Sequence, residues 1–173
     1  VSEAGSTDSF TVVLDAQPSS DVVLSVVSAD TGEATVSPAQ LTFTNGNWDT
    51  AQTATVTGVD DSVLDATQAT AVTVAVVDGS SDDAYDSVAD STVSVTTSDD
   101  DTAAFTLSGT AVTVSEAGST ATFTVVLGAQ PSSDVVLSVV SADTGEATVS
   151  PATLTFTNGN WNAAQTVTVT GVD

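Results

Sequence analysis

The 173-residue sequence contains no lysine, arginine, histidine, cysteine or methionine. Without lysine or arginine nothing neutralises phosphate groups, so we expect no binding to nucleic acid. Without cysteine or histidine, disulfides and thiolate or imidazole metal sites are excluded. The nucleophile schemes that need histidine, cysteine or lysine each lack a member. Paired carboxylates could hydrolyse glycosides, but the sequence predicts no deep aromatic cleft, so we expect no enzyme.

Long apolar runs are also missing. No segment approaches the ~20 residues that span a bilayer, and an anionic membrane surface would repel the chain, so we expect no membrane insertion. What the sequence does have is 23 acidic residues and a formal net charge of −23. Carboxylates, amides and hydroxyls are the side chains left for metal chemistry, and they favour hard cations such as Ca²⁺.

The apolar residues argue for a folded, all-β protein. They make up 40% of the chain, which is too many for a coil held open by its charge. Most are valine and alanine, and threonine is abundant. Because valine and threonine are β-branched, they suit pleated sheets.

The sequence contains a long internal repeat. Residues 1–60 reappear as residues 114–173, with 53 of the 60 positions identical. An offset of 113 residues is too long for one turn of a solenoid and matches a whole domain, so we expect tandem domains of about 113 residues. Such similarity suits a spacer better than separately evolved catalytic modules.

The repeat predicts two domains, each incomplete. We place the first at residues 1–101, without its opening strand, and the second at residues 102–173, truncated at its C-terminal end. Either the chain is a piece of a longer protein with neighbouring repeats, or a neighbouring chain in a fibre completes the truncated domain by strand addition.

Short alternating runs between turn signals predict an antiparallel β-sandwich. We expect core positions at Phe10, Leu14, Leu24, Leu41, Phe43 and Val56. A helical turn is a further expectation within residues 61–70. The expected strands are Ser9–Leu14, Asp21–Val27, Gln40–Thr44, Gln52–Gly58, Ala69–Val77, Thr92–Thr97, Ala104–Leu107, Ala111–Val114, Thr122–Leu127, Asp134–Val140, Thr153–Thr157 and Gln165–Gly171.

Most acids are isolated and are interpreted as a solvated surface, but two groups are clustered. Asp60 and Asp61 follow an expected strand, and Asp99, Asp100 and Asp101 lie at the boundary between repeats. Adjacent carboxylates ~4 Å apart repel by about 4 kcal/mol at an effective dielectric near 20. Either the boundary is a flexible acidic linker, or the carboxylates bind a divalent ion such as Ca²⁺.

Three segments resemble Calx-β domains: VSEAG at residues 1–5, VDDSVLD at 59–65 and SDDDTAAF at 98–105. The run from Ser37 through the Asn47-Trp48 turn to Asp61 is similar to Calx-β-like repeats of large bacterial surface proteins. The resemblance implies an immunoglobulin-like sandwich with Ca²⁺ bound in loops at one end, near the link to the next domain. The ligands it implies are Glu3, Glu33, Asp60, Asp61, the Val63 carbonyl, Asp65, Asp99, Asp100 and Asp101, with Glu116, Glu146 and Asp173 as their second-repeat counterparts.

These features predict an extracellular spacer repeat of a bacterial cell-surface adhesin or fibre, stiffened by Ca²⁺ at its junctions. One alternative is a module that binds carbohydrate or a protein partner. The other is an acidic surface filament of the halophile type, in which hydrated carboxylates maintain solubility without calcium.

Overall fold

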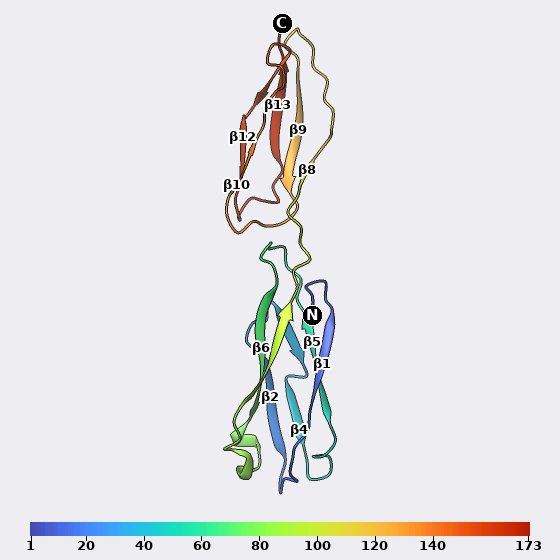
Figure 1. Ribbon diagram of the computed structural model, residues 1–173, viewed down its shortest axis with the longest axis vertical. Helices are drawn as coiled ribbons and strands as arrows, with labels where there is room; N and C mark the ends of the chain where they lie inside the picture. The colour runs from blue at the N-terminus through green and yellow to red at the C-terminus, as the bar shows by residue number, and fades with distance from the viewer. The chain divides into compact units, whose positions relative to one another are not determined.

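The computed structural model describes all 173 residues and contains thirteen strands and two short 3-10 helices (Figure 1). Contacts divide the chain into two compact units. The first unit comprises Val1–Asp61 and Ala66–Asp100, and the second comprises Ser62–Asp65 and Asp101–Asp173. No helix is long and apolar enough to cross a membrane.

The first unit is a sandwich of two antiparallel sheets. Its three-stranded sheet has the order β1-β5-β3 and its four-stranded sheet the order β4-β2-β6-β7. The strands are β1 (Thr7–Val12), β2 (Val22–Ser28), β3 (Ala34–Ser37), β4 (Gln40–Phe43), β5 (Gln52–Gly58), β6 (Gln68–Val76) and β7 (Ser91–Thr97).

Strand alternation builds the core of this unit, because successive side chains point to opposite faces of a sheet. Along β2, Val22, Leu24 and Val26 are buried while the residues between them are less so. Of the predicted core positions, Leu24, Leu41, Phe43 and Val56 are buried, and Phe10 and Leu14 pack against the core while half-buried.

The second unit has a four-stranded sheet of order β11-β13-β9-β8 and a separate pair, β10-β12. Its strands are β8 (Phe105–Leu107), β9 (Thr120–Leu127), β10 (Val135–Ser138), β11 (Ala147–Ser150), β12 (Thr153–Phe156) and β13 (Gln165–Gly171). The order β8-β9-β13-β11 is the A-B-E-D order of immunoglobulin-like sandwiches, and β2-β6-β7 in the first unit is their C-F-G order. The predicted all-β, immunoglobulin-like class is confirmed.

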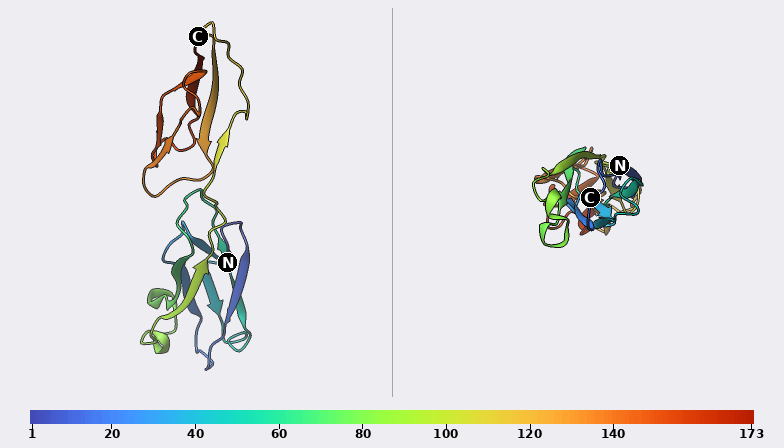
Figure 2. Two further views of the ribbon diagram at one scale, coloured as in Figure 1. Left: turned by 45° about the horizontal axis from the view of Figure 1, so that its top comes forward. Right: turned by 90° about the horizontal axis from the view of Figure 1, so that it is seen from below.

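Three details differ from the sequence-based expectation. The expected strand Ala111–Val114 is absent: β8 pairs with β9 over three residues only, and Val112 is 39% exposed. Strands β3 and β11 were not expected, because each is four residues long and ends directly before a proline, which cannot donate to a ladder. No helix lies in residues 61–70; the 3-10 helices Asp78–Ser80 and Asp83–Tyr85 lie between β6 and β7 instead (Figure 2).

The contacts group Ser62–Asp65, together with Asp101, with the second unit. There Val63 forms a parallel bridge with Gln130. The Leu64 N–H donates to the Gln130 carbonyl at 3.1 Å, and the Gln130 N–H donates to the Ser62 carbonyl at 2.6 Å.

Candidate metal centre

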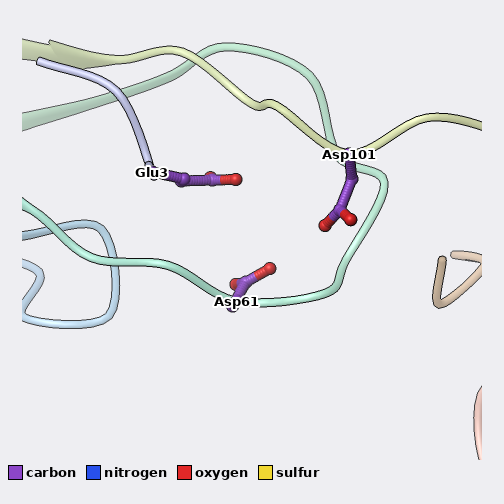
Figure 3. Close-up of side chains that lie close together, drawn as sticks. All are labelled: Glu3, Asp61 and Asp101. Atoms are coloured by element: carbon purple, nitrogen blue, oxygen red, sulfur yellow. The ribbon is translucent and has the colours of Figure 1, made fainter. Parts of the chain in front are cut away.

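Three carboxylates converge where the chain leaves the first unit. One oxygen each from Glu3, Asp61 and Asp101 lies within 4.8 Å of the others (Figure 3). Glu3 lies near the N-terminus, Asp61 three residues after β5, and Asp101 four residues after β7. The two loops that end β5 and β7 therefore approach the N-terminal segment at one point.

The backbone around Glu3 is held by the end of β7. Ser2 and Ser98 form a parallel bridge, the Glu3 N–H donates to the Ser98 carbonyl at 3.1 Å, and the Ser98 N–H donates to the Val1 carbonyl at 3.1 Å. A turn follows at once, in which the Gly5 N–H donates to the Ser2 carbonyl and Gly5 has a φ of 79°. Glu3 is thereby fixed with only 1% of its surface exposed.

Glu33 supports this end of the sandwich through its backbone. Its carbonyl accepts from the Val59 N–H at 3.0 Å and from the Thr97 hydroxyl at 3.3 Å. It therefore ties the ends of β5 and β7 together. Its half-buried carboxylate is not in the three-residue group.

Asp99 also has a structural contact. Its carboxylate accepts from the Ala66 N–H at 2.9 Å, where Ala66 has a φ of 64°. Asp99 does not belong to the converging group, and neither do Asp60 and Asp100, which are exposed.

Burial is uneven across the group of three: Glu3 is buried, Asp101 is half-buried and Asp61 is exposed. One carboxylate oxygen in each of Glu3, Glu33, Asp65 and Asp101 is shielded from solvent. Burial disfavours a charged carboxylate unless something compensates it. Val63, expected as a carbonyl ligand, is half-buried in the second unit.

The second repeat does not reproduce this arrangement. Glu116, Glu146 and Asp173 are all exposed and form no group of converging carboxylates. The backbone contact of Glu33 is nevertheless repeated, because the Val172 N–H donates to the Glu146 carbonyl at 3.0 Å. The backbone contact at this position is thus the same in both repeats.

The charge balance at the group favours a cation. At an effective dielectric of about 20, two carboxylate charges 4.8 Å apart repel by about 3.5 kcal/mol. The sequence has no basic side chain to offset this, and the N-terminal ammonium donates to the Thr96 carbonyl. Three carboxylates offer up to six oxygens, and Ca²⁺ takes 6–8 oxygens including water. The donor set therefore fits Ca²⁺.

One buried acid was not singled out from the sequence. The Asp82 carboxylate accepts from the N–H groups of Ser19, Ser20 and Ala84 and from the Ser19 hydroxyl. These bonds, that from Ala84 first, lower the pKa of Asp82 to about 2. The available signal was an aspartate directly before a short helical turn, a common capping position. Its role is to hold a loop.

The nearby Asp86 has the opposite shift. Desolvation, followed by the charges of Asp78, Asp83 and Asp82, raises the pKa of Asp86. The loop between β6 and β7 thus carries one acid that stabilises it when ionised and one that opposes it.

No family model matches this chain, and no curated protein matches it. Among solved structures, it is similar to SSP-19, an MSP-domain protein like family member in Caenorhabditis elegans, at 17% identity over 57% of this chain and 89% of that chain, with a TM-score of 0.36. It is also similar to CBD12 from CALX1.2, at 14% identity over 100% of this chain and 71% of that chain, with a TM-score of 0.40. Both scores are too low to support an argument, so the fold assignment rests on the strand order.

Proposed function

We propose that this chain is an extracellular spacer repeat of an adhesin or fibre, and that Ca²⁺ held by Glu3, Asp61 and Asp101 fixes the point at which the chain leaves the first sandwich. The observation that carries the proposal is the convergence of these three carboxylates, one of them 1% exposed, in a chain without a basic side chain.

The repeat supports a spacer function. Two copies that agree at 53 of 60 positions repeat one order of strands along the chain, as expected of a protein whose function is to provide length. Outside cells Ca²⁺ is millimolar, so a site with a Kd of about 10⁻⁴–10⁻³ M would still be filled. Binding to the folded form alone would stabilise it by about 1.4 kcal/mol at a tenfold excess over Kd.

Glu3, Asp61 and Asp101 come from segments far apart in sequence, so an ion bound to all three would link these segments. Ca²⁺ bound to Glu3 and Asp61 would hold Asp101, and with it the linker, against the end of the first unit. It would also remove the mutual repulsion of the three carboxylates. A linker restrained in this way resists bending more than a free acidic one.

Thermal unfolding of the whole chain tests the proposal. We expect millimolar Ca²⁺ to raise the melting temperature of the first unit by about 10 °C relative to chelator, since ~1 kcal/mol shifts a domain of this size by about 4–8 °C. Glu3→Gln should remove most of this increase. Its matched control, Glu116→Gln, changes the equivalent exposed residue of the second repeat and should keep it.

Two results would contradict the calcium proposal. One is a pair of melting curves that coincide with and without chelator. The other is full stabilisation by NaCl without divalent ions, which would support the acidic, calcium-independent filament instead.

A further inference from the structure

Two asparagines in the chain are directly followed by glycine. Asn45-Gly46 lies in the turn between β4 and β5, and Asn158-Gly159 lies at the equivalent place between β12 and β13. All four residues are exposed. The sequence around the two pairs is the same over eight residues, LTFTNGNW at positions 41–48 and 154–161. Any difference in the chemistry of the two pairs within the folded chain therefore comes from the structure around them.

The turn itself does not require glycine. Each turn is closed by a hydrogen bond of 3.2 Å from the N–H of its second asparagine to the carbonyl of the threonine that precedes it. Neither Gly46 nor Gly159 has a positive φ. A Cβ added at either position would lie 3.9 Å from a threonine hydroxyl, which is ordinary van der Waals contact. Both positions therefore accept alanine without a change of backbone.

An asparagine before a glycine can react with its own backbone. The glycine nitrogen attacks the side-chain Cγ of the asparagine, and the new N–C bond closes a five-membered imide. The bond from Cγ to Nδ2 breaks, and Nδ2 leaves as ammonia with the proton of the glycine nitrogen. Water then opens the imide to aspartate or isoaspartate. The attack is intramolecular, and glycine has no side chain to obstruct it.

The two asparagine side chains are held differently. The Asn45 Nδ2 donates to the Pro18 carbonyl at 3.3 Å. No hydrogen bond holds the Asn158 side chain, although the equivalent proline, Pro131, is present. The attacking nitrogens are held alike, since each glycine N–H donates to the hydroxyl of the preceding threonine at 3.2 Å. The difference between the pairs is thus confined to the side chain that is attacked.

We propose that Asn158-Gly159 is a site of spontaneous deamidation in the folded chain, and that the contact with Pro18 slows the same reaction at Asn45. The Asn45 amide gives up its hydrogen bond before its Cγ reaches the Gly46 nitrogen, whereas the Asn158 amide has none to give up. The loss of one such bond accounts for a difference in rate of about two- to tenfold.

The neighbouring asparagines are protected in both turns. The Asn47 side-chain oxygen accepts from the Thr44 N–H at 2.5 Å, and that of Asn160 accepts from the Thr157 N–H at 2.6 Å. A tryptophan follows each of them, so a bulky side chain lies beside the nitrogen that would attack. These two asparagines serve as unreactive references.

The modification changes a loop that has a second contact. Both products add a negative charge at residue 158, and in isoaspartate the Asn158 carbonyl becomes a free carboxylate. That carbonyl accepts from the Gln130 Nε2 at 3.0 Å, and the backbone of Gln130 is bonded to Ser62 and Leu64. Deamidation therefore places new charge beside the loop that receives the segment Ser62–Asp65.

Ageing of the full-length chain in mildly alkaline buffer tests the proposal. A glutamate-specific protease separates the two sites, because Asn45 lies in residues 34–116 and Asn158 in residues 147–173. Tandem mass spectrometry then locates each amide that has become a carboxyl. In the folded chain we expect Asn158 to react about two- to tenfold faster than Asn45, and in denaturant we expect equal rates. An unreactive Asn158, equal rates in the folded chain, or a difference that persists in denaturant would overturn the proposal.

Gly159→Ala is the matched control variant. Its Cβ makes only ordinary contact, so the turn is retained, but its methyl group lies beside the attacking nitrogen. We expect the reaction at Asn158 to become slower than that at Asn45, while the rate at Asn45 stays unchanged. An unchanged melting curve shows that the variant is folded. A variant in which Asn158 reacts as fast as in wild type would contradict attack by the glycine nitrogen.

Discussion

The backbone of Ser2 lies against Gly58 so closely that a Cβ on Gly58 would be 2.1 Å from the Ser2 carbonyl oxygen. Real Cβ atoms do not approach backbone atoms at this distance, so only glycine fits at the end of β5. Glu3 follows Ser2 directly, and Asp61 follows Gly58 by three residues. The contact therefore sets the spacing of two of the three converging carboxylates.

We expect Gly58→Ala to move the N-terminal segment away from β5 and to weaken Ca²⁺ binding by about tenfold or more, since three ligands must stay within reach of one ion. Isothermal titration with Ca²⁺ measures the loss. The matched variant is Gly171→Ala, because a Cβ there would lie 2.0 Å from the Ser115 carbonyl oxygen. It imposes the same clash beside the exposed Glu116 and should leave Ca²⁺ affinity unchanged. An equal loss of Ca²⁺ affinity in both variants would show that the contact between Ser2 and Gly58 does not position the site.

The linker at Asp99–Asp101 should be protected by Ca²⁺ from a protease that cleaves after acidic residues. Ca²⁺ bound at Asp101 restrains the backbone that the protease must extend. As the site fills with Ca²⁺, the fraction of chains whose linker is free to be cleaved falls, so we expect cleavage there to slow by about tenfold in millimolar Ca²⁺. Mass spectrometry of the fragments locates the cut. Asp101→Asn should remove the protection, while Asp100→Asn, an exposed neighbour outside the group, should keep it. Protection that survives in the Asp101 variant would argue against a site at this residue.

The sequence predicts the sandwich well because alternation and turn residues are local signals. Leu41 and Phe43 share one face of β4 and are both buried, as the period of two requires. Ala111–Val114 has the same local pattern but forms no strand, because no neighbour pairs with it. Strand formation depends on a partner, which a single-sequence pattern does not specify.

The candidate site was predictable in part for the same reason. Spacing places Asp61 and Asp101 within four residues of the ends of strands, so their general location follows from the sequence. Which acids converge depends on backbone contacts such as that between Glu3 and Ser98. Asp99, also an aspartate and two residues from Asp101, instead accepts a hydrogen bond from the Ala66 N–H.

Substitution of two equivalent phenylalanines compares the stability of the two units. Phe43 and Phe156 are both fully buried, but the core around Phe43 is the larger one, with eleven buried residues against four. Phe→Ala in a core costs about 3–5 kcal/mol. We expect Phe43→Ala to lower the melting temperature of the first unit and Phe156→Ala to leave the second unit unfolded at 25 °C. Calorimetry follows the two transitions. A second unit that still melts cooperatively in the Phe156 variant would show that its small core is more stable than its burial indicates.

Asp82 gives the first unit a pH dependence with a definite sign. Its pKa is lowered to about 2 in the folded state by the bonds from Ala84, Ser19 and Ser20, whereas an unfolded aspartate has a pKa of about 3.9. The unfolded state therefore binds the proton first, and the stability that ionised Asp82 contributes is fully present above about pH 4 and lost as the pH falls to about 2. We expect Asp82→Asn to lower the free energy of unfolding at pH 7 and the difference from wild type to shrink towards pH 2, measured by denaturant titration.

Asp86→Asn is the opposing control: since the folded pKa of Asp86 is raised, its ionisation destabilises the fold, so this variant should be slightly more stable than wild type at pH 7. A stability difference for Asp82→Asn that stays constant from pH 7 to pH 2 would mean that the carboxylate acts through its shape rather than its charge.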